Sequence, residues 1–119
     1  LSAAQELNYR GHNVSVYERD DRIGGLMMYG IPNMKLEKSI LDMRIDLMRQ
    51  EGIKFFPNTD VGSNKKSSVT LKQLSKDNDV VLLATGATSP RDLAIPNREA
   101  KGIHFAMDFL TPQNKICRW

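Results

Sequence analysis

The sequence predicts an α/β fold in which helical crossovers connect the strands of a parallel sheet. Three observations carry this prediction. Helix-like and strand-like segments alternate along the chain, one strand-like segment (14–18, VSVYE) ends on the acidic Glu18, and another (79–84, DVVLLA) is almost wholly apolar. A continuous apolar strand is typical of a parallel sheet that is covered on both faces. We therefore expect residues 14–18 and 79–84 to lie in one sheet.

The other elements follow from apolar spacing and from the glycines that end helices. Residues 1–10 predict a helix ended by Gly11, and residues 36–51 predict a longer one ended by Gly52. The longer segment has apolar side chains at helical spacing, namely Ile40, Leu41, Ile45 and Met48. A short strand and two further helices complete the order, at residues 53–56, 70–76 and 105–110.

A glycine-rich segment, residues 20–34, follows the acidic strand end. It contains too much glycine for regular structure and is too apolar for a solvated linker, and a long loop of this kind inside a domain is usually functional. Adjacent Gly24 and Gly25 allow backbone amides to approach a bulky anion, because no Cβ stands in the way. A flexible turn is the alternative interpretation of this pair.

Glu18 has the position of the acidic residue of a dinucleotide-binding fold. In such folds a carboxylate at the end of the second strand accepts hydrogen bonds from ribose hydroxyls. The strand and G-x-G-x-x-G turn that precede this point are not in the sequence, which opens at Leu1 within a helix-like segment. We therefore expect an internal segment with an incomplete Rossmann-like sheet, its first strand and glycine turn missing. Taken alone, Glu18 is more often an ordinary strand-edge residue.

Thr85 and Gly86 follow the apolar segment 79–84 directly. Ligands of open parallel sheets bind beyond the carboxyl ends of the strands, where Gly86 permits close backbone approach and Thr85 offers a hydroxyl. A simple turn explains this pair equally well. All three features nevertheless fall at strand ends, so together they indicate a nucleotide-binding site.

Composition excludes several other classes of protein. The 119 residues carry a net charge of +3, the only basic doublet is Lys65–Lys66, and no basic stripe with interleaved aromatic residues indicates nucleic-acid binding. The longest purely apolar run, residues 80–84, is too short to cross a membrane.

Residues that could hold a metal or carry out catalysis are scarce. The single cysteine, Cys117, cannot form a cysteine-rich metal site, and His12 and His104 have no ligand spacing. We predict neither a metal site nor a catalytic acid, base or nucleophile in this chain.

Five stretches resemble one family, the NAD(P)H-dependent glutamate synthases. They are residues 16–26 (VYERDDRIGGL), 29–36 (YGIPNMKL), 84–88 (ATGAT), 90–93 (PRDL) and 102–110 (GIHFAMDFL). The resemblance is to the FAD domain, which lies in the small subunit of the bacterial enzyme and in the carboxyl-terminal region of the single-chain eukaryotic one. It implies a partial FAD-binding domain at residues 1–114 and leaves residues 115–119 as a divergent tail, which an artefact of the sequence would also explain.

The resemblance implies an electron-input role. In this family NADH or NADPH reduces FAD, and electrons pass through iron–sulfur clusters to an FMN site, where glutamate is made from 2-oxoglutarate and glutamine-derived ammonia. The donor domain, clusters and FMN would lie outside this chain, and the partner would be the large subunit or the amidotransferase and FMN region of the same chain. An intracellular location is expected, cytoplasmic or in an organelle such as a plastid.

The resemblance also implies roles for individual residues. Glu18 would hold the FAD ribose, and Gly25 and Leu26 would offer amides near the pyrophosphate. Lys35 would lie close to the cofactor, and the backbone of Val61 would contact the adenine. Thr85 and Gly86 would line the passage towards the NAD(P)H domain.

Two features depart from the family, and two alternatives stay open. Pro96–Asn97 stands where the family tends to have Pro-Gly, and the tail from Ile116 does not match. Dihydropyrimidine dehydrogenase shares Glu18, the GGL run at 24–26 and the Ile31–Pro32 pair, so the same module in another flavoprotein is one alternative. A non-catalytic nucleotide-binding domain is the other.

Overall fold

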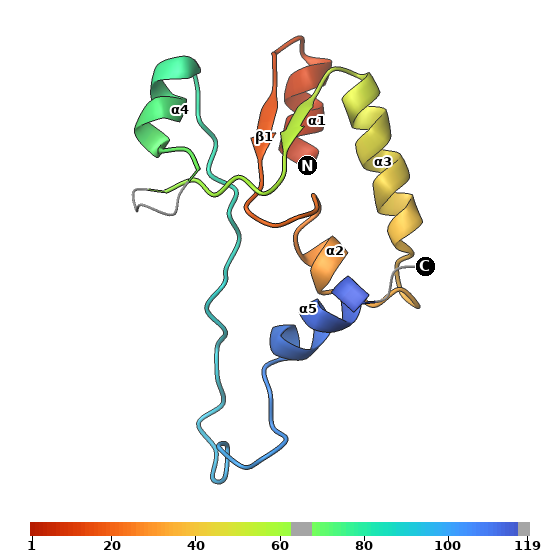
Figure 1. Cartoon of the computed structure of the whole chain (residues 1–119), viewed down its shortest axis with the longest axis vertical. Coiled ribbons are helices and arrows are strands. Elements are labelled where there is room, and N and C mark those ends of the chain that lie inside the picture. Colours follow the sequence, from red (N-terminus) through yellow and green to blue (C-terminus); the bar gives the residue numbers. More distant parts are fainter. Residues whose placement is uncertain (63–67, 117–119) are drawn as a thin grey trace.

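The chain folds as a small α/β arrangement with two parallel strands (Figure 1). The computed structural model describes residues 1–62 and 68–116, so Lys65, Lys66 and Cys117 lie outside the described residues. The elements are α1 (Ser2–Tyr9), β1 (Ser15–Tyr17), α2 (Leu26–Tyr29), α3 (Lys38–Gln50), β2 (Lys54–Phe56), α4 (Leu71–Asp77) and α5 (Ala106–Ile116).

The two strands pair in parallel through a helical crossover, as the sequence predicts. Val16 lies opposite Phe55, and the ladder extends past both ends of β1. The amide of Lys54 donates to the carbonyl of Val14 at 3.0 Å, and that of Glu18 donates to the carbonyl of Phe56 at 3.0 Å. The α/β class with parallel pairing is therefore confirmed, on a smaller sheet than expected.

Two small apolar clusters hold the elements together. In the first, Ala4 of α1, Met48 of α3 and Ile53 are buried against β1 and β2. In the second, Met28 and Tyr29 of α2 are buried against Leu41 of α3. Helix α3 contributes to both clusters, so it connects the sheet to the glycine-rich segment. The expected apolar face of α3 is buried at Leu41, Ile45 and Met48 but not at Ile40, which remains about half exposed.

Residues 79–84 form no strand, so the prediction of a second buried strand is wrong for this structure. Val80 is 82% exposed and Leu83 is 69% exposed, and within the described ranges no ladder partner is present. A strand needs a neighbour for its amides and carbonyls, and apolar composition alone does not supply one. The chain instead leaves α4 as a long extended trace before it returns at α5 (Figure 1).

The molecule is more open than a single domain of its length. Its radius of gyration is 17.0 Å, whereas a compact chain of this length has about 13.5 Å. Its accessible surface is 9708 Å², against roughly 6,500 Å² for a compact protein of this mass. Apolar side chains on the extended segment, including Leu93 and Ile95, account for part of that surface.

Three local features differ from the sequence-based expectations or refine them. A helical turn, α2, lies within the segment expected to be irregular, and α5 continues past Pro112 to Ile116. Asn114 anchors this extension, because its side-chain amide donates to the carbonyls of Tyr29 at 2.9 Å and Leu110 at 3.0 Å. Asn97 has a φ of 62°, the left-handed conformation that glycine adopts freely and asparagine tolerates.

Among the described residues, no helix combines the length and apolarity that crossing a membrane requires.

Replacing Ile53 by alanine should lower the free energy of unfolding by about 2–5 kcal/mol, because the side chain is only 2% exposed and its loss leaves a cavity beside Ala4 and Met48. Ile40→Ala is the matched control, since Ile40 is 48% exposed, and it should cost less than about 1 kcal/mol. Urea unfolding followed by circular dichroism measures both. Equal losses would contradict the placement of the core.

Candidate functional site

The candidate site lies where β1 and β2 end side by side. Glu18 directly follows β1, and its carbonyl accepts a hydrogen bond from the amide of Thr59 at 2.8 Å. The carbonyl of Asp20 accepts from the amide of Asn58 at 2.9 Å. These bonds tie the turn after β1 to the segment after β2, as the parallel register requires. Both carboxyl ends therefore contribute to one surface.

The Glu18 side chain is held at this surface. It is half-buried, and its Oε1 accepts a hydrogen bond from the amide of Asp20 at 3.0 Å. A carboxylate can accept several donors, so one internal bond fixes its direction and leaves capacity for hydroxyl groups. This geometry suits the ribose-binding role that its sequence position indicates.

The glycine pair makes a turn that other residues would strain. Gly24 has a φ of +125° and Gly25 a φ of +53°, in the region that residues with a Cβ rarely adopt. A Cβ on Gly24 would meet the Cβ of Met28 at 3.3 Å, whereas one on Gly25 would face open space. No hydrogen bond from the amides of Gly25 or Leu26 occurs within residues 1–62 and 68–116. The turn thus presents backbone donors to a free surface.

Tyr29 fixes this turn from beneath. Its hydroxyl donates to Oδ1 of Asp21 at 2.5 Å and accepts from the amide of Arg22 at 2.9 Å. The Tyr29 hydroxyl holds the pKa of the Asp21 carboxyl below its usual range. Burial, followed by the Asp21 carboxylate, raises the pKa of Tyr29 above its usual range. Lys115 of α5 approaches both, with its Nζ 3.5 Å from Oδ1 of Asp21 and 5.2 Å from the ring centre of Tyr29.

Sequence reasoning missed the anchoring role of Tyr29. The available signal was an aromatic residue four positions after Gly25, which is one helical turn, with carboxylates shortly before the glycines.

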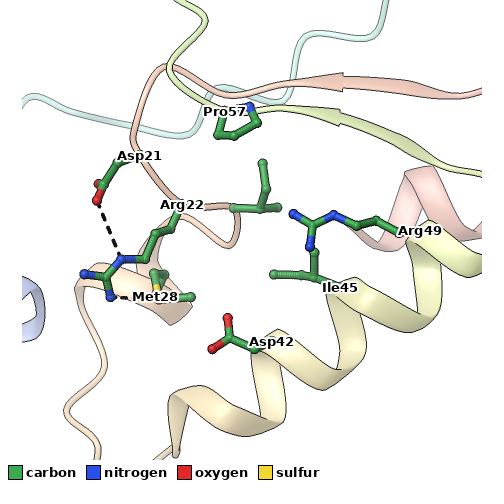
Figure 2. Close-up of a pocket in the computed structure, with 8 residues that line it drawn as sticks. Asp21, Arg22, Met28, Asp42, Ile45, Arg49 and Pro57 are labelled. Carbon is green, nitrogen blue, oxygen red and sulfur yellow. Dashed lines mark hydrogen bonds and ion pairs between the residues drawn. The ribbon is translucent and has the colours of Figure 1, made fainter. Parts of the chain in front are cut away.

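A hollow of about 120 Å³ lies between the turn and α3 (Figure 2). Its lining residues are Asp21, Arg22, Ile23, Met28, Asp42, Ile45, Arg49 and Pro57. The arginines already have partners in the protein: Nε of Arg22 is 3.6 Å from Asp21, and Nη1 of Arg49 is 2.6 Å from Asp46. Because both arginines are paired within the protein, we assign the hollow to the scaffold. Nowhere in the described chain do three potential metal ligands gather.

The predicted site residues lie on several parts of the chain. Glu18, Gly25 and Leu26 lie along the loop between β1 and α2, and no hydrogen bond joins Glu18 to the other two in the described residues. Val61 lies two residues beyond Thr59, where it forms a parallel bridge with Val69. Lys35 is exposed just after the glycine-rich segment, and its amide donates to the carbonyl of Pro32 at 2.9 Å. Thr85 and Gly86 are exposed on the extended segment, and no hydrogen bond joins them to the turn in the described residues.

Comparison with known proteins first identifies a class. The family described as flavin-containing amine oxidoreductase matches residues 1–29, which include α1, β1 and the glycine turn. The match covers Glu18 and the glycine turn but not β2, and it supports a flavin as the cofactor.

Several of the individual relatives are named as glutamate synthases. Over 97% of its length the chain is 56% identical to "Glutamate synthase [NADH]" of Schizosaccharomyces pombe, of which it covers 5%. It is 51% identical, also over 97% of its length, to "Glutamate synthase [NADPH] small chain" of Bacillus subtilis, of which it covers 22%. The resemblance that the sequence motifs indicate is therefore confirmed. The chain spans about a fifth of the bacterial small chain and about a twentieth of the yeast protein.

Replacing Tyr29 by phenylalanine should lower the free energy of unfolding by about 1–3 kcal/mol. The reason is that the buried hydroxyl donates a hydrogen bond to Asp21 and accepts one from the amide of Arg22. The raised pKa of Tyr29 stabilises the folded chain below about pH 10, and this contribution is lost as the pH rises beyond it. The difference in phenolate absorbance between wild type and variant should therefore develop only above pH 10. Tyr9→Phe is the control, since Tyr9 is exposed. Its unfolding free energy should change by less than about 0.5 kcal/mol, and an equal loss would contradict the anchoring role.

Proposed function

We propose that this chain forms the FAD-binding segment of an NAD(P)H-dependent glutamate synthase. The observation that carries the proposal is the junction of β1 and β2, where the amide of Asp20 orients the Glu18 carboxylate. The same loop continues to Gly25 and Leu26, whose amides have no hydrogen-bond partner among the described residues. The similarity to glutamate synthases over 97% of the chain supports it independently.

The residues present fit a dinucleotide. Glu18 would accept hydrogen bonds from the ribose of FAD, and the amides of Gly25 and Leu26 would donate to its pyrophosphate. The backbone near Val61 would meet the adenine, and Lys35 would lie close to the cofactor. Thr85 and Gly86 would line the way towards the nicotinamide donor once the extended segment packs against the rest of the protein. When bound, FAD accepts a hydride from NADH or NADPH.

The rest of the reaction depends on regions other than these residues. In the proposed enzyme, glutamate formation from 2-oxoglutarate and glutamine-derived ammonia would require iron–sulfur clusters and an FMN site held by those other regions. The partner is a large subunit, or the amidotransferase and FMN region of the same chain, in keeping with relatives named as small chains. The protein acts inside the cell, without nucleic-acid or membrane binding.

A second candidate is the same flavin module in a different oxidoreductase. One observation favours it: the chain is 36% identical over 97% of its length to "Putative oxidoreductase AegA" of Escherichia coli, of which it covers 17%. Assay of the full polypeptide distinguishes the two. Glutamate formation from glutamine and 2-oxoglutarate supports the first, and flavin reduction without it supports the second.

Glu18→Ala in the full polypeptide should weaken FAD binding by about 1–3 kcal/mol, the usual effect of removing a charged hydrogen-bond acceptor from a polar partner. Titration of the apoprotein, followed by flavin fluorescence, measures the dissociation constant. Glu99→Ala is the matched control, because Glu99 is exposed in the turn around Asn97. An unchanged dissociation constant for Glu18→Ala would leave this residue as an ordinary strand-edge carboxylate.

Residues 1–119 expressed alone should neither retain FAD nor transfer hydride from NADH or NADPH. Their apolar surface is uncovered at residues 79–95, so the site elements lack the packing that would order them around a cofactor. Gel filtration after reconstitution tests retention, and a diaphorase assay with an artificial acceptor tests hydride transfer. Tight stoichiometric binding or measurable turnover would contradict this expectation.

A further inference from the structure

Lys38 occupies a position that a helix does not favour. It is the first residue of α3, whose first turn contains no acidic side chain and whose N-cap, Glu37, makes no side-chain capping bond. The amino end of a helix carries partial positive charge, so a cation there is repelled. Lys38 is also partly buried, and this burial lowers the pKa of its ammonium group. A strong local interaction must offset these effects.

That interaction is a set of backbone carbonyls between Met27 and Leu36. The Nζ of Lys38 donates to the carbonyl of Met27 at 2.9 Å, to that of Leu36 at 3.4 Å and to that of Ile31. An ammonium group has three donors and is compact enough for three acceptors to converge on it. One side chain therefore ties together the beginning, middle and end of residues 27–36.

The tied carbonyls lie next to two candidate cofactor contacts. Met27 directly follows Leu26, whose amide faces the open surface, and Leu36 directly follows Lys35. Lys38 itself is on α3, which is fixed to the sheet through Met48 and Ile53. The ammonium group therefore ties the backbone between Leu26 and Lys35 to helix α3, and this restrains the distance between these two residues.

We propose that Lys38 is a positioning residue of the flavin site. Its side chain holds the Leu26 amide and Lys35 at the separation that the bound cofactor requires. This inference rests on the proposed FAD-binding function. Lys38 touches backbone carbonyls and acts on the cofactor through the segment that it holds.

The test compares Lys38→Met, Lys38→Arg and Lys72→Met in the full polypeptide. Lys38→Met removes the ammonium but keeps the apolar stem, and it should raise the FAD dissociation constant about tenfold or more. Lys38→Arg keeps the charge and can still reach some of the carbonyls, so it should retain a substantial part of the affinity. Lys72 is exposed on α4, and Lys72→Met should leave binding unchanged. Amide hydrogen exchange should accelerate at residues 26–36 in Lys38→Met and stay unchanged in β1 and β2.

The outcomes separate this inference from the function on which it rests. Failure of the wild-type polypeptide to bind FAD would refute the proposed function. Wild-type affinity in Lys38→Met, or an equal loss in Lys38→Arg and Lys38→Met, would refute only the role of Lys38. If Lys38→Met does not fold, as judged by circular dichroism, Lys38→Gln takes its place under the same criteria.

Discussion

The parallel pairing of β1 with β2 is the interaction on which the candidate site depends. The register that places Val16 opposite Phe55 also brings the end of β1 beside the segment after β2. Consequently the backbone of Glu18 and Asp20 can bond to that of Thr59 and Asn58. The rings of Tyr17 and Phe56 are stacked, with their centroids 4.9 Å apart. A shift of the register by one residue would turn Tyr17 away from Phe56 and would break these backbone hydrogen bonds. The position of the carboxylate is therefore a consequence of strand register.

The glycine turn adds the second requirement, since it reverses the chain within a few residues and is then held by side chains from elsewhere. Tyr29 anchors it from below through Asp21 and Arg22, and Lys38 holds its far side through carbonyls. Neither Tyr29 nor Lys38 is a predicted cofactor contact. They give the turn a fixed shape, which matters because a turn rich in glycine has more conformational freedom to lose on binding.

The sequence predicted the elements whose stability is local and missed those that depend on partners. Helix α3 was expected because Leu41, Ile45 and Met48 recur at helical spacing and Gly52 ends it, and the structure places it within two residues of the expected bounds. Residues 79–84 were expected as a strand from apolar composition, which indicates a tendency to be buried but does not supply the neighbouring strand. The same limit applies to the site. The position of Glu18 follows from strand order, and the spacing of Tyr29 from Gly25 was an available signal, whereas no local pattern specifies the carbonyls that Lys38 contacts.

Under the proposed function, the exposed segment and the cofactor site are thermodynamically coupled. Thr85 and Gly86 can contribute to the site only when residues 79–95 are covered, because at present they lie on an uncovered extended segment. Any surface that covers the apolar side chains there also orders these two residues, and so strengthens flavin binding. Reciprocally, bound flavin must strengthen the contact with that surface by the same factor. Cofactor retention and packing of the extended segment should therefore rise and fall together.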